Sequence, residues 1–76
     1  MTGRPVKRSL TLRGHRTSVS LEDDFWKAFC DIAKKNGQPI NQLAAEIDEM
    51  RVDIGLASAI RLFVLKDFQT RLQSTG

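Results

Sequence analysis

The stretch Arg16-Thr-Ser-Val-Ser-Leu21 alternates polar and apolar residues over the length of one β-strand. Successive strand side chains point to opposite faces, so Thr17, Val19 and Leu21 share one face. Three acidic residues follow at 22–24, where they stabilise the positive end of a helix dipole and indicate a helix start. The sequence therefore predicts a strand over residues 15–21 that leads directly into a helix.

The other face of this strand carries Arg16, Ser18 and Ser20. An arginine pairs well with guanine edges, and a serine hydroxyl can donate to or accept from several bases, so this face suits base contact in a DNA groove. An ordinary solvated face shows the same alternation, and the pattern alone leaves that alternative open. These three side chains are the predicted base-contacting residues.

A second, shorter alternation precedes the first, over residues 8–12. Between the two alternating runs stands Arg13-Gly14, and a two-residue loop with glycine second is a hairpin signal. Residues 1–7 contain a glycine and a proline but little apolar content, so we expect them to form a flexible basic arm. The predicted organisation is this arm followed by one domain over 8–76, which the chain enters through a possible N-terminal β-hairpin.

Apolar residues at three- and four-residue spacing predict three helices after the strand. The first spans 22–36 and ends before Gly37, since glycine readily adopts the left-handed conformation that closes a helix. The second spans 39–50 and begins at a proline, which is common in a first helical turn. The third spans 56–73 and is apolar over so much of its circumference that we expect it to be buried between subunits.

A chain of 76 residues makes one small domain with a marginal core. Cys30 is the only cysteine and His15 the only histidine, so no internal disulfide or conventional zinc site can form, and dimerisation is the common remedy. Cys30 lies in the apolar stripe of the first predicted helix, which is typical of a small buried hydrophobe rather than a nucleophile. The inward strand face and the helix stripes predict a dimer core of Val19, Leu21, Phe25, Phe29, Ile32, Leu43 and Ile47.

Positive charge is concentrated at the start of the chain. The first 20 residues hold five of the 12 basic residues and none of the nine acidic ones, which indicates an anionic partner. Nucleic acid is favoured over a membrane surface, because this segment lacks an amphipathic helical pattern, although a disordered solubilising tail would also explain the bias. The predicted phosphate-contacting side chains are Arg4, Lys7, Arg8 and Arg13.

No apolar run is long enough to span a bilayer, and no signal peptide is recognisable. We therefore expect no membrane partner and a cytoplasmic location in association with the nucleoid. No paired acid and base or metal-ligand constellation stands out in the sequence, so we expect neither catalysis nor a cofactor.

The order of strand, helix, glycine turn and helix resembles the ribbon-helix-helix DNA-binding proteins. The octapeptide Gly14-His-Arg-Thr-Ser-Val-Ser-Leu21, followed by Phe25-Trp26, is similar to the signature of one subfamily, and the similarity extends into the third helix at 58–65. The resemblance implies a mainly α fold with a short β-ribbon, in which two chains intertwine and pair their strands antiparallel. It also implies that backbone N–H groups at the start of the second helix bind a phosphate, here those of Ile40 and Asn41.

The sequence thus predicts a sequence-specific DNA-binding homodimer that represses transcription by inserting a β-ribbon into the major groove of double-stranded DNA. The alternative is a ribbon-helix-helix dimer that binds a protein partner, as an adaptor or antitoxin-like module, without contacting bases. The extra hairpin and the third helix favour this alternative, because a minimal DNA-binding ribbon requires neither.

Overall fold

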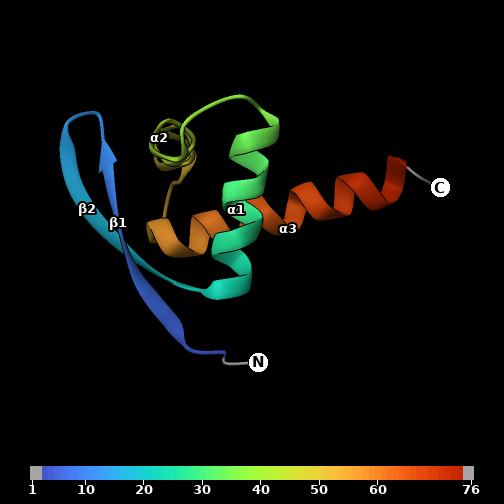
Figure 1. Ribbon diagram of the computed structural model, residues 1–76, viewed down its shortest axis with the longest axis horizontal. Helices are drawn as coiled ribbons and strands as arrows, with labels where there is room; N and C mark the ends of the chain where they lie inside the picture. Colours follow the sequence, from blue (N-terminus) through green and yellow to red (C-terminus); the bar gives the residue numbers. More distant parts are fainter. Residues whose placement is uncertain (1–2, 75–76) are drawn as a thin grey trace.

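Two antiparallel strands and three helices follow one another in the computed structural model, which describes residues 3–74 (Figure 1). Strand β1 spans Pro5–Leu12 and β2 spans His15–Glu22. Helix α1 spans Asp23–Lys35, α2 spans Ile40–Met50 and α3 spans Leu56–Ser74. The predicted ribbon followed by three helices is confirmed, with helix boundaries that differ from the predicted ones by at most one residue.

The two strands form a hairpin around Arg13 and Gly14, as the sequence predicts. Both turn residues have positive φ, 52° and 85°, which is the conformation that matches the twist of a two-residue hairpin. The register runs from Leu12 opposite His15 to Pro5 opposite Glu22. Strand β1 therefore begins three residues earlier than predicted, and residues 5–7 of the expected arm belong to it.

Pairing with β2 explains this longer strand. Val6 lies opposite Leu21, so it continues the inward row of β1 that the sequence places at Leu10 and Leu12. Pro5 has no N–H, but a proline is tolerated as the first residue of a strand because its backbone does not need to donate there.

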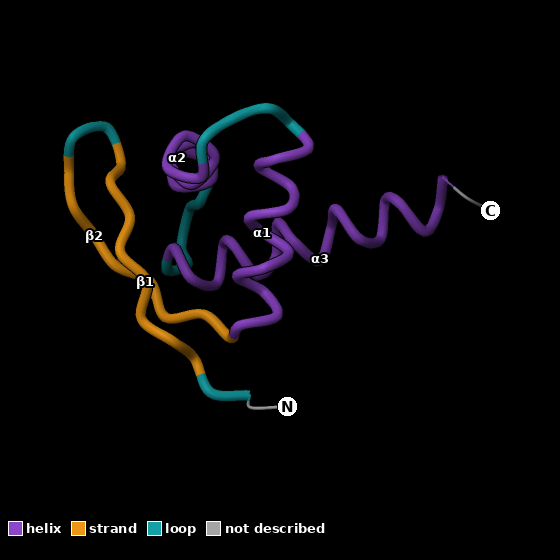
Figure 2. The backbone as a smooth tube through the Cα atoms, in the orientation of Figure 1, coloured by secondary structure: helices purple, strands orange, loops and turns teal. Residues whose placement is uncertain are grey.

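The hairpin covers one side of the helices, and its inner face closes the core (Figure 2). All five elements contribute buried apolar side chains: Leu10, Val19, Leu21, Phe29, Ile32, Ala33, Leu43, Ala44, Ile47, Ala59, Ile60 and Val64. Six of the seven residues predicted to form a dimer core are buried here within a single chain, and the seventh, Phe25, is half-buried. One chain by itself therefore buries most of the residues that the sequence assigns to a dimer core.

Helix α1 ends where the sequence predicts, for the predicted reason. Gly37 has a φ of 68°, and its N–H donates to the Lys34 carbonyl while the Gln38 N–H donates to the Ala33 carbonyl. This pair of bonds is the Schellman closure, which satisfies carbonyls left unpaired at a helix end. A residue with a side chain would be strained at Gly37, so the short link to α2 depends on this glycine.

Helix α3 is only partly packed. Its first half buries Ala59, Ile60 and Val64 against the other elements, whereas its second half extends away from them (Figure 1). The sequence predicts that the whole helix is buried between subunits, whereas within one chain the buried apolar side chains of α3 belong to its first half. No helix within residues 3–74 has both the length and the hydropathy needed to cross a membrane.

Candidate nucleic-acid interface

The outward face of the hairpin carries the predicted base-contacting residues. The register places Arg16, Ser18 and Ser20 of β2 opposite Thr11, Ser9 and Lys7 of β1, respectively. All six side chains are exposed, and the positions that alternate with them carry Leu10, Val19 and Leu21, which are buried on the other face of the hairpin. The face therefore presents four hydroxyls and two cations, and none of the six is an acid.

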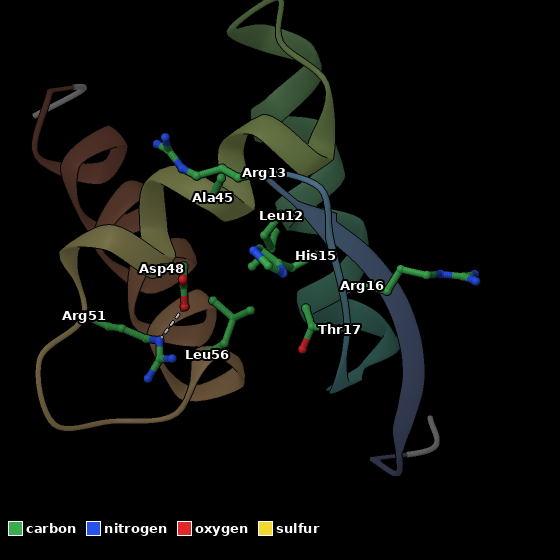
Figure 3. Close-up of a pocket in the computed structure, with 9 residues that line it drawn as sticks. All are labelled: Leu12, Arg13, His15, Arg16, Thr17, Ala45, Asp48, Arg51 and Leu56. Carbon is green, nitrogen blue, oxygen red and sulfur yellow. Dashed lines mark hydrogen bonds and ion pairs between the residues drawn. The ribbon is translucent and has the colours of Figure 1, made fainter.

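Ser9 and Thr11 belong to this face, although the sequence analysis did not single them out. Their parity was visible in the sequence, because Leu10 and Leu12 mark the inward face of the same strand. Figure 3 shows Arg16 directed away from the pocket lined by its neighbours, whereas Leu12 is directed toward α2.

A ribbon of two strands has dimensions that suit a DNA groove. Neighbouring strands lie about 4.8 Å apart, and the major groove of B-form DNA is about 12 Å wide, so a two-stranded ribbon enters it with room for side chains. A four-stranded sheet, which would result if two complete hairpins also paired with each other, spans about 14 Å before side chains are added. The intrachain hairpin is therefore already a ribbon of the appropriate width.

Side chains from two helices reach the edges of the hairpin. The Thr11 N–H on the edge of β1 donates to Oδ1 of Asn41, at 3.0 Å, and the Ser20 carbonyl on the edge of β2 accepts from Nη2 of Arg61, at 3.2 Å. In an antiparallel pair, alternate residues direct their backbone N–H and C=O groups away from the partner strand. Thr11 and Ser20 are both residues of this kind. Asn41 and Arg61 therefore hold α2 and α3 against opposite edges of the ribbon.

The contact of Asn41 brings the start of α2 beside the ribbon. Pro39 precedes the helix, and its carbonyl accepts from the N–H groups of Gln42 and Leu43 at 3.1 Å each. Among the described residues, no hydrogen bond engages the N–H groups of Ile40 and Asn41. These two donors lie at the positive end of the helix dipole, which is the arrangement that favours a bound anion.

Arg8 does not lie with the other predicted phosphate-contacting residues. It is opposite Val19 on the inner face, where Nη2 donates to Oδ1 of Asp23 at 3.1 Å and the guanidinium lies 5.2 Å from the centre of the Trp26 ring. Its Nε is buried and has no hydrogen-bond partner among the described residues. The positions of Leu10 and Leu12 on the same strand already indicate this inward position of Arg8, which its ion pair with Asp23 occupies in the structure.

The remaining predicted cations are exposed. Arg4 precedes β1, Lys7 is on the outward face, and Arg13 is in the turn, where it forms an ion pair with Glu49 of α2. Pairs between exposed charges contribute little, so the Arg13 guanidinium can exchange Glu49 for another anion at small cost. Arg4, Lys7 and Arg13 are thus exposed on or beside the hairpin, whereas Arg8 is on its inner face.

Glu22, the last residue of β2, continues the row of Arg16, Ser18 and Ser20, and it forms an ion pair with Arg61 of α3. Nε of Arg61 donates to Oε1 of Glu22 at 2.8 Å, and Nη2 donates to Oε2 at 3.2 Å. This hydrogen bonding lowers the pKa of the Glu22 carboxyl below its ordinary value of 4.5. The fork-shaped pair therefore stays ionised and carries little net charge toward the ribbon.

The pocket at the turn end of the hairpin has a volume of about 430 Å³ (Figure 3). Two of its three arginines are engaged by nearby acids: Arg13 pairs with Glu49, and Nε of Arg51 donates to Oδ1 of Asp48 at 2.6 Å. Cys30 lies on α1, and burial raises the pKa of its thiol, so the reactive thiolate is scarce at neutral pH. Within residues 3–74, no group of three His, Cys, Asp or Glu side chains is placed to hold a metal ion.

Comparison with protein families matches residues 5–68 to the ribbon-helix-helix domain. The match begins at the first residue of β1 and runs through both strands, α1, α2 and most of α3. The chain therefore belongs to the ribbon-helix-helix family, whose members are in general DNA-binding regulators. Searches of curated proteins and of solved structures gave no significant match.

Proposed function

We propose that the protein is a sequence-specific DNA-binding homodimer that represses transcription by inserting its hairpin into the major groove. The observation that carries this proposal is the outward face of the hairpin, with Arg16, Ser18 and Ser20 opposite three further polar residues and no acid among the six. Within a family of DNA-binding regulators, such a face is explained by base contact better than by solvation alone.

Each part of the ribbon has a role in the proposed complex. Arg16, Ser18 and Ser20 contact base edges, and Arg16 supplies the strongest contact, because a guanidinium bonds to two acceptors of one guanine. Ser9 and Thr11 complete the set of hydroxyls facing the groove floor. Around the ribbon, the phosphate contacts come from Arg4, Lys7, Arg13 and the N–H groups of Ile40 and Asn41.

The length of the ribbon is the reason to propose two copies. From Arg16 to Ser20 a strand rises about 13 Å, and a base pair occupies about 3.4 Å, so one ribbon contacts roughly four base pairs. Four base pairs recur far too often in a genome to define one operator. A homodimer contacts two half-sites, and its occupancy of an operator in the cytoplasmic nucleoid would exclude RNA polymerase.

A specific observation also supports the alternative, a protein-interaction adaptor or antitoxin-like module. Met50, Val52, Phe68 and Leu72 are exposed to 70%, 84%, 54% and 59%, which is a large exposure for four large apolar side chains of a small domain. An apolar surface of this kind suits protein association rather than DNA, so the same fold could act through a protein partner alone.

The test is a selection of bound sequences from a pool of random duplex DNA. Wild-type protein is expected to enrich a defined motif, and the double variant Lys7→Gln/Arg16→Gln is expected to lose that enrichment. The matched control is Lys34→Gln/Lys35→Gln, which removes the same charge from two exposed residues at the end of α1 and should enrich the wild-type motif.

The outcome separates the two functions. A wild-type protein that enriches no motif contradicts base recognition and favours the adaptor. Equal loss in both double variants would show that net charge, and not the ribbon face, governs binding.

A further inference from the structure

The outward row of β2 ends in an acid. Glu22 is the last residue of the strand, and strand alternation places it on the same face as Ser18 and Ser20. It is two residues beyond Ser20, which is about 7 Å further along the strand. A carboxylate at this position repels the phosphates of any duplex that the row contacts, so by itself it opposes DNA binding.

The Glu22 side chain does not serve the helix that follows it. Glu22 is the N-cap residue of α1, where a side-chain oxygen commonly accepts from a free N–H of the first turn, but its side chain makes no such bond. The first turn of α1 has Asp23 and Asp24 as its own acids, and these stabilise the helix dipole. The Glu22 carboxylate is therefore not required as a cap and is available for another contact.

That contact comes from α3. Nε of Arg61 donates to Oε1 of Glu22 at 2.8 Å, and Nη2 donates to Oε2 at 3.2 Å. Nη2 also lies 3.2 Å from the Ser20 carbonyl oxygen, so the guanidinium is fixed by three acceptors at the end of the outward row. Two parallel bonds between a guanidinium and a carboxylate orient both groups as well as neutralising them.

Arg61 extends from a well-anchored part of α3. Ile60, the preceding residue, is fully buried, and Val64, one turn further on, is 8% exposed. The two side chains of the ion pair are themselves only 30% and 28% exposed, for Arg61 and Glu22 respectively. Packing of this half of α3 therefore holds the guanidinium at a fixed place relative to β2.

We propose that Arg61 is a positioning residue for DNA binding, which acts by holding the Glu22 carboxylate and cancelling its charge at the end of the base-contacting row. The inference rests on the proposed function, because it concerns the same face of the ribbon. It goes beyond that function by giving α3, which contributes no residue to the ribbon face, a role in DNA affinity.

The experiment is a charge-removal cycle, read by fluorescence anisotropy of the selected duplex. Arg61→Gln leaves Glu22 with its ordinary pKa of 4.5, so the carboxyl is ionised at neutral pH without a counter-charge. A separation of about 7 Å is within the Debye length, about 10 Å at 0.1 M salt, so we expect the variant to bind on the order of tenfold more weakly than wild type. Adding Glu22→Gln to Arg61→Gln should restore the affinity to within about twofold of wild type.

Two controls separate this role from net charge and from stability. Arg61→Gln/Asp31→Asn has the same net charge as wild type but leaves Glu22 ionised, and it should bind as weakly as Arg61→Gln. Asp31 is exposed on α1, eight residues and about 12 Å beyond the start of that helix. Arg61→Gln and Arg61→Gln/Glu22→Gln both lack the ion pair, so urea unfolding should show a similar stability for the two while their DNA affinities differ.

The outcomes distinguish failure of this role from failure of the function. If wild type enriches a motif but Arg61→Gln/Glu22→Gln binds as weakly as Arg61→Gln, the guanidinium contacts DNA directly and the proposed role of Glu22 is wrong. Equal recovery with Asp31→Asn, or no loss in Arg61→Gln, overturns it as well. A wild type that enriches no motif contradicts the proposed function itself, and the role of Arg61 in DNA binding with it.

Discussion

Arg8 and Arg16 are on opposite faces of the same hairpin, so replacing each by alanine should have opposite consequences. Arg8 is on the inner face, where its side chain is 31% exposed and bonds to Asp23 beside the Trp26 ring. Arg16 is on the outer face, and among the described residues no hydrogen bond or ion pair engages its side chain. The two substitutions remove the same charge, so any difference between them reports the orientation of the side chains.

The magnitudes follow from these contacts. Arg8→Ala loses a partly exposed ion pair, worth about 0–1 kcal/mol, and a cation–π contact worth about 0.5–1 kcal/mol, together with packing of the aliphatic stem. We expect a loss of about 1–2 kcal/mol in the free energy of unfolding. Arg16→Ala should change stability by less than about 0.5 kcal/mol but should weaken binding to the selected duplex by about 1–3 kcal/mol.

Urea unfolding and a duplex titration measure the two effects separately. Trp26 is the only tryptophan and lies beside Arg8, so its fluorescence follows unfolding directly. Fluorescence anisotropy of a labelled duplex gives the affinity of each variant at one fixed salt concentration. For Arg16→Ala, the selected motif should also become degenerate at one base pair in each half-site.

One pattern of results would refute this reasoning. If Arg8→Ala weakens DNA binding as much as Arg16→Ala while leaving the unfolding midpoint unchanged, the assignment of the two faces is wrong. If Arg16→Ala leaves both affinity and motif unchanged, the outward face is not the DNA-binding surface, and the protein-binding alternative becomes the better account of the fold.

Three further predictions concern the core, the Glu22 pair and the N-terminal charge. Leu21→Ala should lower the free energy of unfolding by about 2–5 kcal/mol in urea titrations, because Leu21 is fully buried; a loss below about 1 kcal/mol would show a loosely packed core. The folded-state pKa of Glu22 is lowered, so its stabilising contribution is present above the unfolded value of 4.5 and lost as pH falls through the folded pKa. The stability difference between wild type and Glu22→Gln should therefore shrink from pH 7 to pH 3, and a constant difference would contradict the pairing with Arg61. Arg4→Gln should weaken binding to all duplexes alike and reduce the slope of log affinity against log salt by about one unit, whereas an unchanged slope would show that Arg4 contacts no phosphate.

The sequence by itself determined the order and kind of the elements. Alternation over Arg16-Thr-Ser-Val-Ser-Leu21 identified β2 and its outward face, Arg13-Gly14 identified the hairpin turn, and Gly37 identified the end of α1. Each of these features depends on residues close together in the chain, since side-chain parity, turn conformation and helix closure are local properties of the backbone. The same patterns carried the resemblance to the family that the comparison confirmed.

Only the tertiary structure decided which polar and charged side chains are bonded to other residues of the protein. Arg8 bonds to Asp23 across 15 positions, Asn41 to Thr11 across 30, and Arg61 to Glu22 across 39. No local pattern encodes such pairs, because each one exists only after the hairpin has packed against the helices. Packing also determined that one chain closes its own core, since β1 supplies β2 with a strand partner and the first half of α3 fills the remaining side. The apolar residues of α3 were visible in the sequence, but whether they face the core or the solvent depends on how far the helix extends beyond the elements that cover it.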